Sequence, residues 1–190
     1  MYNDSIESFT DCRYKIIRNV IDNKICKLTA IDIKLLEDKQ KFLNKNEYTN
    51  KNNCFSYYSA LITEALLLFL KPTIERCMNV ELSPTYSLLQ IYYNKSIQSK
   101  IKNSDACEYS ASLCISIDET PWELWIKDEN DNDIPIVLYP GDMIIYKGVE
   151  HWRNTYDKNH QIQVYLHYVN ANGIYNNYIY DNRPILGIKK

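Results

Sequence analysis

The sequence of 190 residues lacks the features that mark several specialised classes of protein. Its six cysteines include no C-x-x-C pair, which argues against a structural zinc knuckle. The longest uninterrupted apolar run, residues 65–70, is far too short to cross a bilayer. No basic stripe is present and the net charge is -2, so the sequence shows no positively charged surface that would attract a nucleic acid. We therefore expect neither a membrane protein nor a nucleic-acid-binding protein.

The start of the chain, MYNDSIESFTDC, also lacks the basic residues and the following apolar run of a signal peptide. The thiols are then expected in a reducing compartment, most of them as buried core residues. A length of 190 residues is typical of one domain with a sizeable core. We expect a soluble, cytoplasmic protein whose single domain spans residues 1–190.

Glycine and proline are scarce, with four and six residues, whereas tyrosine occurs 17 times. The tyrosines spread over the whole chain, so the codon bias of an AT-rich genome explains them better than a carbohydrate or peptide platform. One of the few glycines lies in YPGD, where Pro140 and Gly141 occupy the two central positions of a type II turn. This turn is predicted to lead directly into the segment MIIYKGVEHW.

The first half of the chain has the periodicity of helices. One helix is predicted to begin at Thr29, a residue type suited to the N-cap. Apolar side chains then recur at helical spacing, namely Ile33, Leu36 and Leu43. A second helix is predicted over residues 56–70, and its apolar character indicates that it packs against a sheet. Pro72 is expected to interrupt or restart this helix, with residues 73–79 as a further turn.

The second half consists of short runs rich in β-branched and aromatic residues. Six strands are predicted there, over residues 84–94, 109–117, 122–127, 134–138, 143–148 and 162–169. The acidic segment DENDND, residues 128–133, is predicted to be a solvated hairpin turn. A calcium loop of the EF-hand type is disfavoured because its glycine and closing glutamate are missing.

Alternation along three of these strands separates polar from apolar side chains. The polar faces carry Gln90 and Tyr92 in the first strand, Ser110, Ser112, Cys114 and Ser116 in the second, and Gln161, Gln163, Tyr165 and His167 in the last. This pattern fits a surface sheet with its polar side in water. It fits equally a curled sheet whose polar side lines a cavity while helices cover the apolar side. Helices followed by many short strands favour an α+β, mainly β fold of the jelly-roll type.

Six segments occur in a characteristic order: LSPTYSLLQIYY, ACEYSASLCISI, PWELW, YPGDMIIYKGVEHWRN, QVYLHYV and YDNRPILG. In order and spacing, over roughly two-thirds of the chain, they resemble the 2-oxoglutarate/Fe(II)-dependent dioxygenase superfamily. The closest resemblance is to its prolyl 4-hydroxylase-like branch. Residues 55–190 form the matching part, and residues 1–54 are then an N-terminal helical extension.

The resemblance implies a double-stranded β-helix that begins near residue 84, with N-terminal helices packed on the sheet and a polar pocket inside. In this family an H-x-D pair and a distal histidine form a 2-His-1-carboxylate triad for Fe(II). The triad leaves open positions for 2-oxoglutarate and O₂. Two neutral imidazoles and one carboxylate hold the ion and partly balance its charge.

His151, within GVEHWRN, matches the distal histidine of the family. The span QSKIKNSDACEYS aligns without a gap and places Ile101 at the H position, Asn103 at the D position and Ser104 at the following arginine. Isoleucine cannot bind a metal, and asparagine offers only a neutral carbonyl oxygen. The resemblance therefore implies a degenerate metal site in which two of three ligands are missing.

A rebuilt site is the alternative, in which His151 is joined by Asp105 and His167, or by Asn103 as a weak ligand. The gap-free match around ACEYS argues against the slipped loop that Asp105 would need. His167 is expected to have a packing or hydrogen-bonding role instead. His160 is expected to be an ordinary loop histidine.

The resemblance also implies that Tyr92 faces the cosubstrate. The last strand lacks the Arg or Lys that usually binds the tail carboxylate of 2-oxoglutarate, so Arg153 is the nearest candidate and Lys158 the next. Of the two tryptophans in PWELW, Trp122 and Trp125, one is expected in the core and the other at the pocket mouth.

We therefore expect a dioxygenase-like protein that is catalytically impaired or non-enzymatic, a pseudoenzyme whose barrel pocket binds a small molecule or peptide. Fe(II) and 2-oxoglutarate are expected as cofactors only if the protein is active. The alternative is an active 2-oxoglutarate-dependent oxygenase with an altered metal centre using His151, which hydroxylates a peptide side chain or a small molecule. A third hypothesis is a cupin-like binding or structural module whose pocket is filled by side chains.

Overall fold

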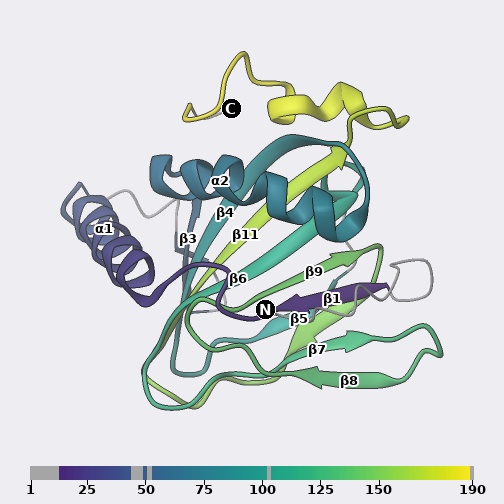
Figure 1. The fold of residues 1–190 in the computed structure, drawn as a ribbon. Helices are drawn as coiled ribbons and strands as arrows, with labels where there is room; N and C mark the ends of the chain where they lie inside the picture. The colour runs from purple at the N-terminus through teal and green to yellow at the C-terminus, as the bar shows by residue number, and fades with distance from the viewer. Residues whose placement is uncertain (1–12, 44–48, 51–52, 102–103, 189–190) are drawn as a thin grey trace.

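The computed structural model describes residues 13–43, 49–50, 53–101 and 104–188, and the backbone alone at residues 49, 50 and 101. Two antiparallel sheets face each other, and two helices pack on the outer side of the larger one (Figure 1). The larger sheet has the order β1 (Tyr14–Ile17), β9 (Met143–Lys147), β6 (Tyr109–Ile117), β11 (His160–Asn170), β4 (Leu82–Tyr93), β3 (Cys54–Tyr58) and β2 (Thr49–Asn50). The smaller sheet has the order β5 (Gln98–Ile101), β10 (His151–Arg153), β7 (Leu124–Lys127) and β8 (Asp133–Ile136).

The chain alternates between the two sheets as it proceeds. Strands β4, β6, β9 and β11 belong to the larger sheet, and the strands between them, β5, β7 with β8, and β10, belong to the smaller sheet. This alternation winds the chain into a double-stranded β-helix, or jelly roll. The fold is therefore α+β and mainly β, which confirms the predicted class.

Helix α1 spans Asn23–Phe42 and begins at an aspartate cap. The Asp22 carboxylate accepts hydrogen bonds from the backbone N–H groups of Lys24 and Ile25, at 2.8 and 2.9 Å. The predicted start at Thr29 is wrong, because Thr29 lies inside the helix and is 1% exposed. Aspartate supplies the cap earlier in the chain, and the helix gains about two further turns.

Helix α2 spans Leu61–Met78 and packs across β4 and β11, as predicted for a helix against a sheet (Figure 1). Its predicted start at residue 56 is wrong, because Cys54–Tyr58 pairs with β4 as strand β3. Pro72 does not interrupt the helix. Proline at position 72 has no N–H to donate to the Leu68 carbonyl. Both residues lie on the exposed side of the helix, where water can donate a hydrogen bond to that carbonyl instead.

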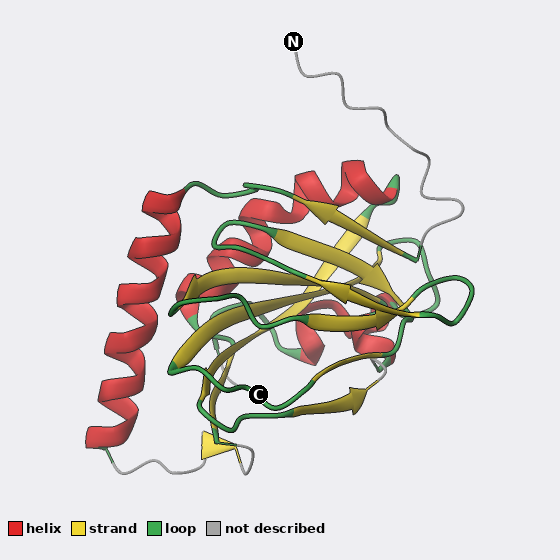
Figure 2. Cartoon of the chain, turned by 90° about the horizontal axis from the view of Figure 1, so that it is seen from below, coloured by secondary structure: helices red, strands yellow, loops and turns green. Residues whose placement is uncertain are grey.

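The apolar side of the larger sheet and the inner sides of the helices form the outer core. Its fully buried members include Ile33, Leu67, Leu70 and Ile74 from the helices and Leu89, Ile91, Leu113, Ile145, Val164 and Leu166 from the sheet. Figure 2 shows both helices outside the strands. Within the described part of the chain, neither helix has the length and apolar character needed to cross a membrane.

All six predicted strands are present, with ends displaced by one or two residues. Several short strands were not predicted, among them β1 and β3 in the half of the chain that was expected to be helical. Strands β5 and β10 also escaped prediction, because four and three residues are too few to establish a period of two. Since β1 pairs with β9, the first 54 residues contribute a strand to the sheet as well as a helix.

Both predicted turns are confirmed. The Asp142 N–H donates to the Tyr139 carbonyl at 2.8 Å, and Gly141 has a φ of +93°, as a type II turn requires. A Cβ atom at Gly141 would lie 2.5 Å from the Ile21 carbonyl oxygen, so the turn packs against the chain just before α1. In the β7–β8 hairpin, the Asp128 carboxylate accepts from the backbone N–H groups two and four residues later, each at 2.8 Å.

A buried ion pair fixes the C-terminal segment to α2. Arg183 Nη2 lies 2.7 Å from Glu64 Oε1 and 3.0 Å from the Thr85 carbonyl oxygen, and both charged side chains are buried. The Gly187 N–H donates to the second oxygen of Glu64. The tail is therefore a packed part of the fold rather than a loose end.

Replacing Gly141 with alanine is expected to destabilise the protein by about 2–4 kcal/mol, because the new Cβ meets the Ile21 carbonyl while the backbone stays left-handed. Gly148→Ala is the matched control: its φ is +63° and nothing lies within 4 Å of the added Cβ. That control should lose only about 1 kcal/mol. Urea unfolding followed by circular dichroism measures both, and equal losses would contradict the role of the close approach.

Candidate ligand-binding site inside the barrel

The polar side of the larger sheet faces the space between the two sheets. Its buried polar side chains include Gln161, Gln163, Tyr165 and His167 on β11 and Ser110 and Ser112 on β6. The alternating apolar residues of β11 lie in the outer core under the helices. Of the two interpretations of the alternation, the curled sheet with a polar interior is therefore correct, and the surface sheet with a wet polar side is not.

Strand β10 lies between β5 and β7 and carries His151 at its start and Arg153 at its end. His151 pairs with Ile101 of β5 on one side and with Ile126 of β7 on the other. The register therefore places position 101 directly across from His151, where the resemblance implies a metal-binding histidine. Asn103, the second degenerate position, lies outside the described residues.

His151 is buried, with 1% of its surface exposed. Its Nδ1 donates to the Val149 carbonyl at 3.3 Å, and its ring packs on that of Tyr146 with centroids 4.8 Å apart. Burial lowers the pKa of His151 to about 4; the hydrogen bond to Val149 opposes this shift and the charge of Arg153 adds to it. The imidazole is thus neutral at physiological pH.

His167 lies further along the interior, near the end of β11. Its Nδ1 is 2.8 Å from the Ser110 hydroxyl, and its ring packs on Tyr86 with centroids 4.6 Å apart. Burial is the main cause that lowers its pKa to about 3, and the nearby charge of His151 lowers it further. His167 therefore has the hydrogen-bonding and packing contacts that were expected of it.

Asp105 is exposed at the start of the 3-10 helix η2 (Asp105–Cys107). The negative charge of its carboxylate raises the pKa of Tyr175. His160 is the half-buried first residue of β11, and Lys158 lies in the preceding loop, 3.8 Å from Asp157. The structure therefore does not bring Asp105 and His160 to the interior site.

Arg153 is the main charged group of the interior and is 2% exposed. Its Nη1 donates to the Trp122 carbonyl, and its guanidinium carbon lies 5.2 Å from the centroid of the Trp122 ring. Within the described residues its Nε and Nη2 have no hydrogen-bond partner of normal geometry and no carboxylate forms an ion pair with it, but a contact with the Tyr165 hydroxyl lowers the pKa of that tyrosine against the rise caused by burial. A buried cation in this state is suited to an anionic ligand.

Tyr92 belongs to a hydrogen-bonded group beside Arg153. Its hydroxyl is 2.8 Å from that of Tyr165. The side-chain Oε1 of Gln98 lies 3.3 Å from the Tyr92 hydroxyl and 3.2 Å from the Tyr165 hydroxyl. Burial raises the pKa of both tyrosines, and the charge of Arg153 opposes the rise. Both tyrosines are therefore neutral, with Tyr92 donating to the side-chain amide oxygen of Gln90 and Tyr165 to that of Gln98.

The buried amides of β11 also present donors. Gln161 Oε1 accepts from the Trp122 backbone N–H at 3.0 Å, and Gln163 Oε1 accepts from the Ser112 hydroxyl at 3.3 Å. These contacts fix the amide orientation and leave each Nε2 buried without a hydrogen-bond partner of normal geometry among the described residues. The Gln163 side chain also contacts the Cys114 thiol, whose pKa burial raises and this contact lowers. Together with Arg153, the interior offers several unpaired donors, which match a ligand rich in acceptor oxygens.

Sequence reasoning identified His151, Tyr92 and Arg153 but assigned no role to Gln98, Gln161 or Gln163. Alternation along β11 was the available signal for the two glutamines of that strand, since it placed them on the polar face. Gln98 lies on β5, a strand too short to be predicted.

No protein-family model and no curated protein sequence matches this chain. Among solved structures, a Pseudomonas putida prolyl-4-hydroxylase superposes with a TM-score of 0.67 and 7% identity, covering 87% of this chain and 96% of that one. The α-ketoglutarate-dependent epimerase SnoN from nogalamycin biosynthesis gives 0.68 at 8% identity, covering 87% and 79%. HygX from Streptomyces hygroscopicus, solved with nickel and 2-oxoglutarate, gives 0.61 at 10%, covering 86% and 85%.

This chain has the fold of the 2-oxoglutarate/Fe(II) oxygenases. In the described ranges no group of three or more His, Cys, Asp or Glu residues is arranged to hold a metal ion, and the residue paired with His151 on β5 is an isoleucine. Arg153 on β10 and the amides of Gln161 and Gln163 on β11 are buried like His151, and each has donor atoms without a hydrogen-bond partner of normal geometry in the described residues.

The two buried histidines make stability depend on pH. Their pKa values in the folded protein lie below the ordinary 6.5, so the unfolded chain binds protons first as the pH falls. Stability is therefore complete above about pH 6.5 and declines below it, toward about pH 4 for His151 and about 3 for His167. We expect each histidine to remove about 1.5 kcal/mol of unfolding free energy between pH 6.5 and 5, measured by urea denaturation.

The double variant His151→Gln with His167→Gln should lose most of this pH dependence. His160→Gln is the matched control, because His160 is the half-buried first residue of β11 and is not one of the buried interior residues. It should keep the wild-type slope. If the double variant also keeps that slope, other groups titrate in this range and the neutral state of the two histidines is refuted.

Proposed function

We propose that this protein has the oxygenase fold without its iron chemistry and binds a small carboxylate ligand inside the barrel. The observation that carries this proposal is the register of β10, in which position 101, an isoleucine, lies across from His151. A side chain without a lone pair cannot replace a histidine ligand. One neutral imidazole is then left without the partners that hold Fe(II).

The interior contacts support the ligand class. Arg153 is buried, makes no ion pair within the described residues and has two unpaired nitrogens. A guanidinium binds a carboxylate through two parallel hydrogen bonds, and a buried pair of this kind is stronger than an exposed one. The amides of Gln161 and Gln163 add neutral donors on β11, in the facing sheet. A dicarboxylic acid such as 2-oxoglutarate is the natural first probe.

The proposed unit is the whole chain of residues 1–190. Strand β1 supports this, because it extends the larger sheet by pairing with β9 although it belongs to the first 54 residues. The N-terminal part thus acts as more than a helical buttress.

The purified protein is expected to retain Fe(II) or Mn(II) only in substoichiometric amounts and to leave 2-oxoglutarate intact under O₂. The double variant Ile101→His with Asn103→Asp should gain metal affinity, approaching one ion per chain, because it restores the ligand types opposite His151. Metal content after dialysis, measured by plasma mass spectrometry, tests this. Adding His151→Ala to the double variant should remove the gain.

Tight binding of one Fe(II) by the wild type, with decarboxylation of 2-oxoglutarate, would overturn the proposal in favour of an active oxygenase with an altered centre. Loss of both properties in His151→Ala would then identify His151 as a ligand of that centre. If the double variant binds no metal, the interior has lost more than two ligands, and the cupin-like module becomes the better description.

2-Oxoglutarate is expected to bind the metal-free protein in isothermal titration calorimetry, and Arg153→Gln should weaken this binding at least about tenfold. Lys158→Gln is the control, since that lysine lies in the loop outside the barrel and carries the same charge. Equal effects of the two substitutions would mean that only net charge matters, which would refute a site at Arg153.

A further inference from the structure

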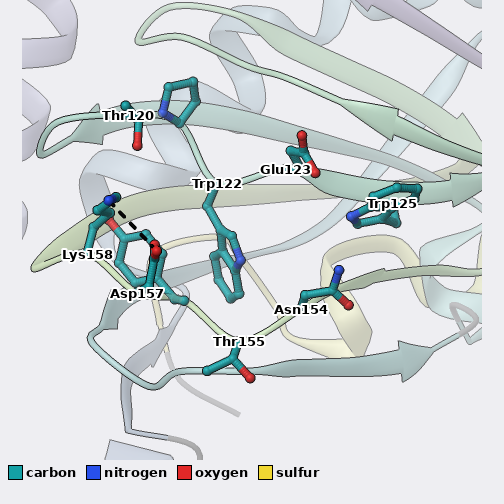
Figure 3. A pocket seen from close by; sticks show the side chains of 10 residues that line it. Thr120, Trp122, Glu123, Trp125, Asn154, Thr155, Asp157 and Lys158 are labelled. Carbon is teal, nitrogen blue, oxygen red and sulfur yellow. Dashed lines mark ion pairs between the residues drawn. The ribbon is translucent and has the colours of Figure 1, made fainter.

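A cavity lies beyond the end of β10, with none of His151, Arg153, Gln161 or Gln163 in its lining. It has a volume of about 250 Å³ and is formed by the segment before β7 and the loop after β10 (Figure 3). Its lining consists of Thr120, Pro121, Trp122, Glu123, Trp125, Asn154, Thr155, Tyr156, Asp157 and Lys158. His151 begins β10 and this cavity follows the end of β10, so the cavity is separate from the histidine end of the barrel.

Trp122 lies in the middle of the pocket with polar side chains around it (Figure 3). Trp122 is 9% exposed, and its indole N–H has no hydrogen-bond partner among the described residues. Its backbone is held at both ends, by Gln161 at the N–H and by Arg153 at the carbonyl. The ring also packs on Tyr92 and Tyr156, with centroids 5.0 Å away in each case. Trp122 is therefore a firmly held aromatic side chain whose buried indole N–H has no hydrogen-bond partner among the described residues.

Two further buried donors line the same cavity. The indole N–H of Trp125 and the hydroxyl of Tyr156 likewise have no partner among the described residues. The carboxylates of Glu123 and Asp157 and the amide of Asn154 supply acceptors around them. The pocket thus combines aromatic surface with both donors and acceptors in a small volume.

We propose that this pocket binds a neutral polyhydroxylated molecule, in the form of a single sugar ring. A hydroxyl group both donates and accepts, so it can pair with the indole N–H groups and with the carboxylates, while the C–H face of the ring packs on indole. Two carboxylates disfavour an anion. A quaternary ammonium ion is disfavoured because it would leave the N–H donors unpaired and lie near the ammonium of Lys158.

The volume limits the size of the ligand. Pockets for drug-sized molecules measure roughly 300–1,000 Å³, and this cavity is smaller. It therefore suits one ring rather than an oligosaccharide. Because Trp122 contacts Arg153 through its carbonyl and its ring, an occupied pocket would also be in contact with the interior ligand site through this one residue.

The test is titration of the full chain with D-glucose, D-galactose, D-mannose and D-ribose at millimolar concentrations, followed by tryptophan fluorescence and saturation-transfer NMR. Saturable binding of at least one of these sugars is expected. Trp125→Phe, which keeps the ring and removes the N–H, should weaken that binding about fivefold. Trp152→Phe is the matched control, because Trp152 packs against Trp125 from outside the pocket lining. It should leave the affinity unchanged.

Asn154→Ala, an exposed position of the lining, provides a second pocket variant if Trp125→Phe does not fold. Absence of saturable binding for all four sugars overturns the proposal, as does binding of tetramethylammonium in their place. Sugar binding that resists both pocket variants and is lost in Arg153→Gln would put the ligand inside the barrel and equally overturn it. If the protein binds a sugar but not 2-oxoglutarate, only the proposal for the barrel interior is refuted. The results therefore distinguish failure of one proposal from failure of the other.

Discussion

A single buried cation organises the interior of this barrel. Arg153 occupies the space between two sheets, where an uncompensated charge costs several kcal/mol. The fold supplies part of the compensation through the carbonyl and the ring of Trp122. The charge in turn lowers the pKa of His151 and opposes the rise in the pKa of Tyr92 and Tyr165. Burial is the main cause of these shifts, and the guanidinium adds to the shift of His151 and opposes those of the two tyrosines.

The sheet register decides which chemistry this interior can support. Alternation along β11 sends one set of side chains to the helix-covered core and the other set inward, so the polar lining follows directly from the backbone. The same geometry brings β5 alongside β10 and aligns position 101 with His151. Position 101 is an isoleucine, so an apolar residue pairs with a neutral histidine where the resemblance to the dioxygenases implies a histidine ligand.

The long strands were predictable because eight or more residues of alternation give a clear period, as in β6 and β11. His151 and Arg153 were found only through the resemblance, since β10 has three residues and no readable period. The start of α1 was missed because a suitable cap, Thr29, lies inside the helix that Asp22 begins. The contact of Trp122 with Arg153 was beyond prediction, because a loop must return to the end of a distant strand to make it.

The unpaired donors also bear on the choice between a ligand-binding protein and a purely structural module. An interior that serves only to hold two sheets together is most stable when it is apolar, or when every polar group is paired. Here Arg153 and the amides of Gln161 and Gln163 have buried nitrogens without protein partners in the described residues. Each such group lowers stability unless a ligand completes it. The arrangement is thus costly for a scaffold and favourable for a binding site.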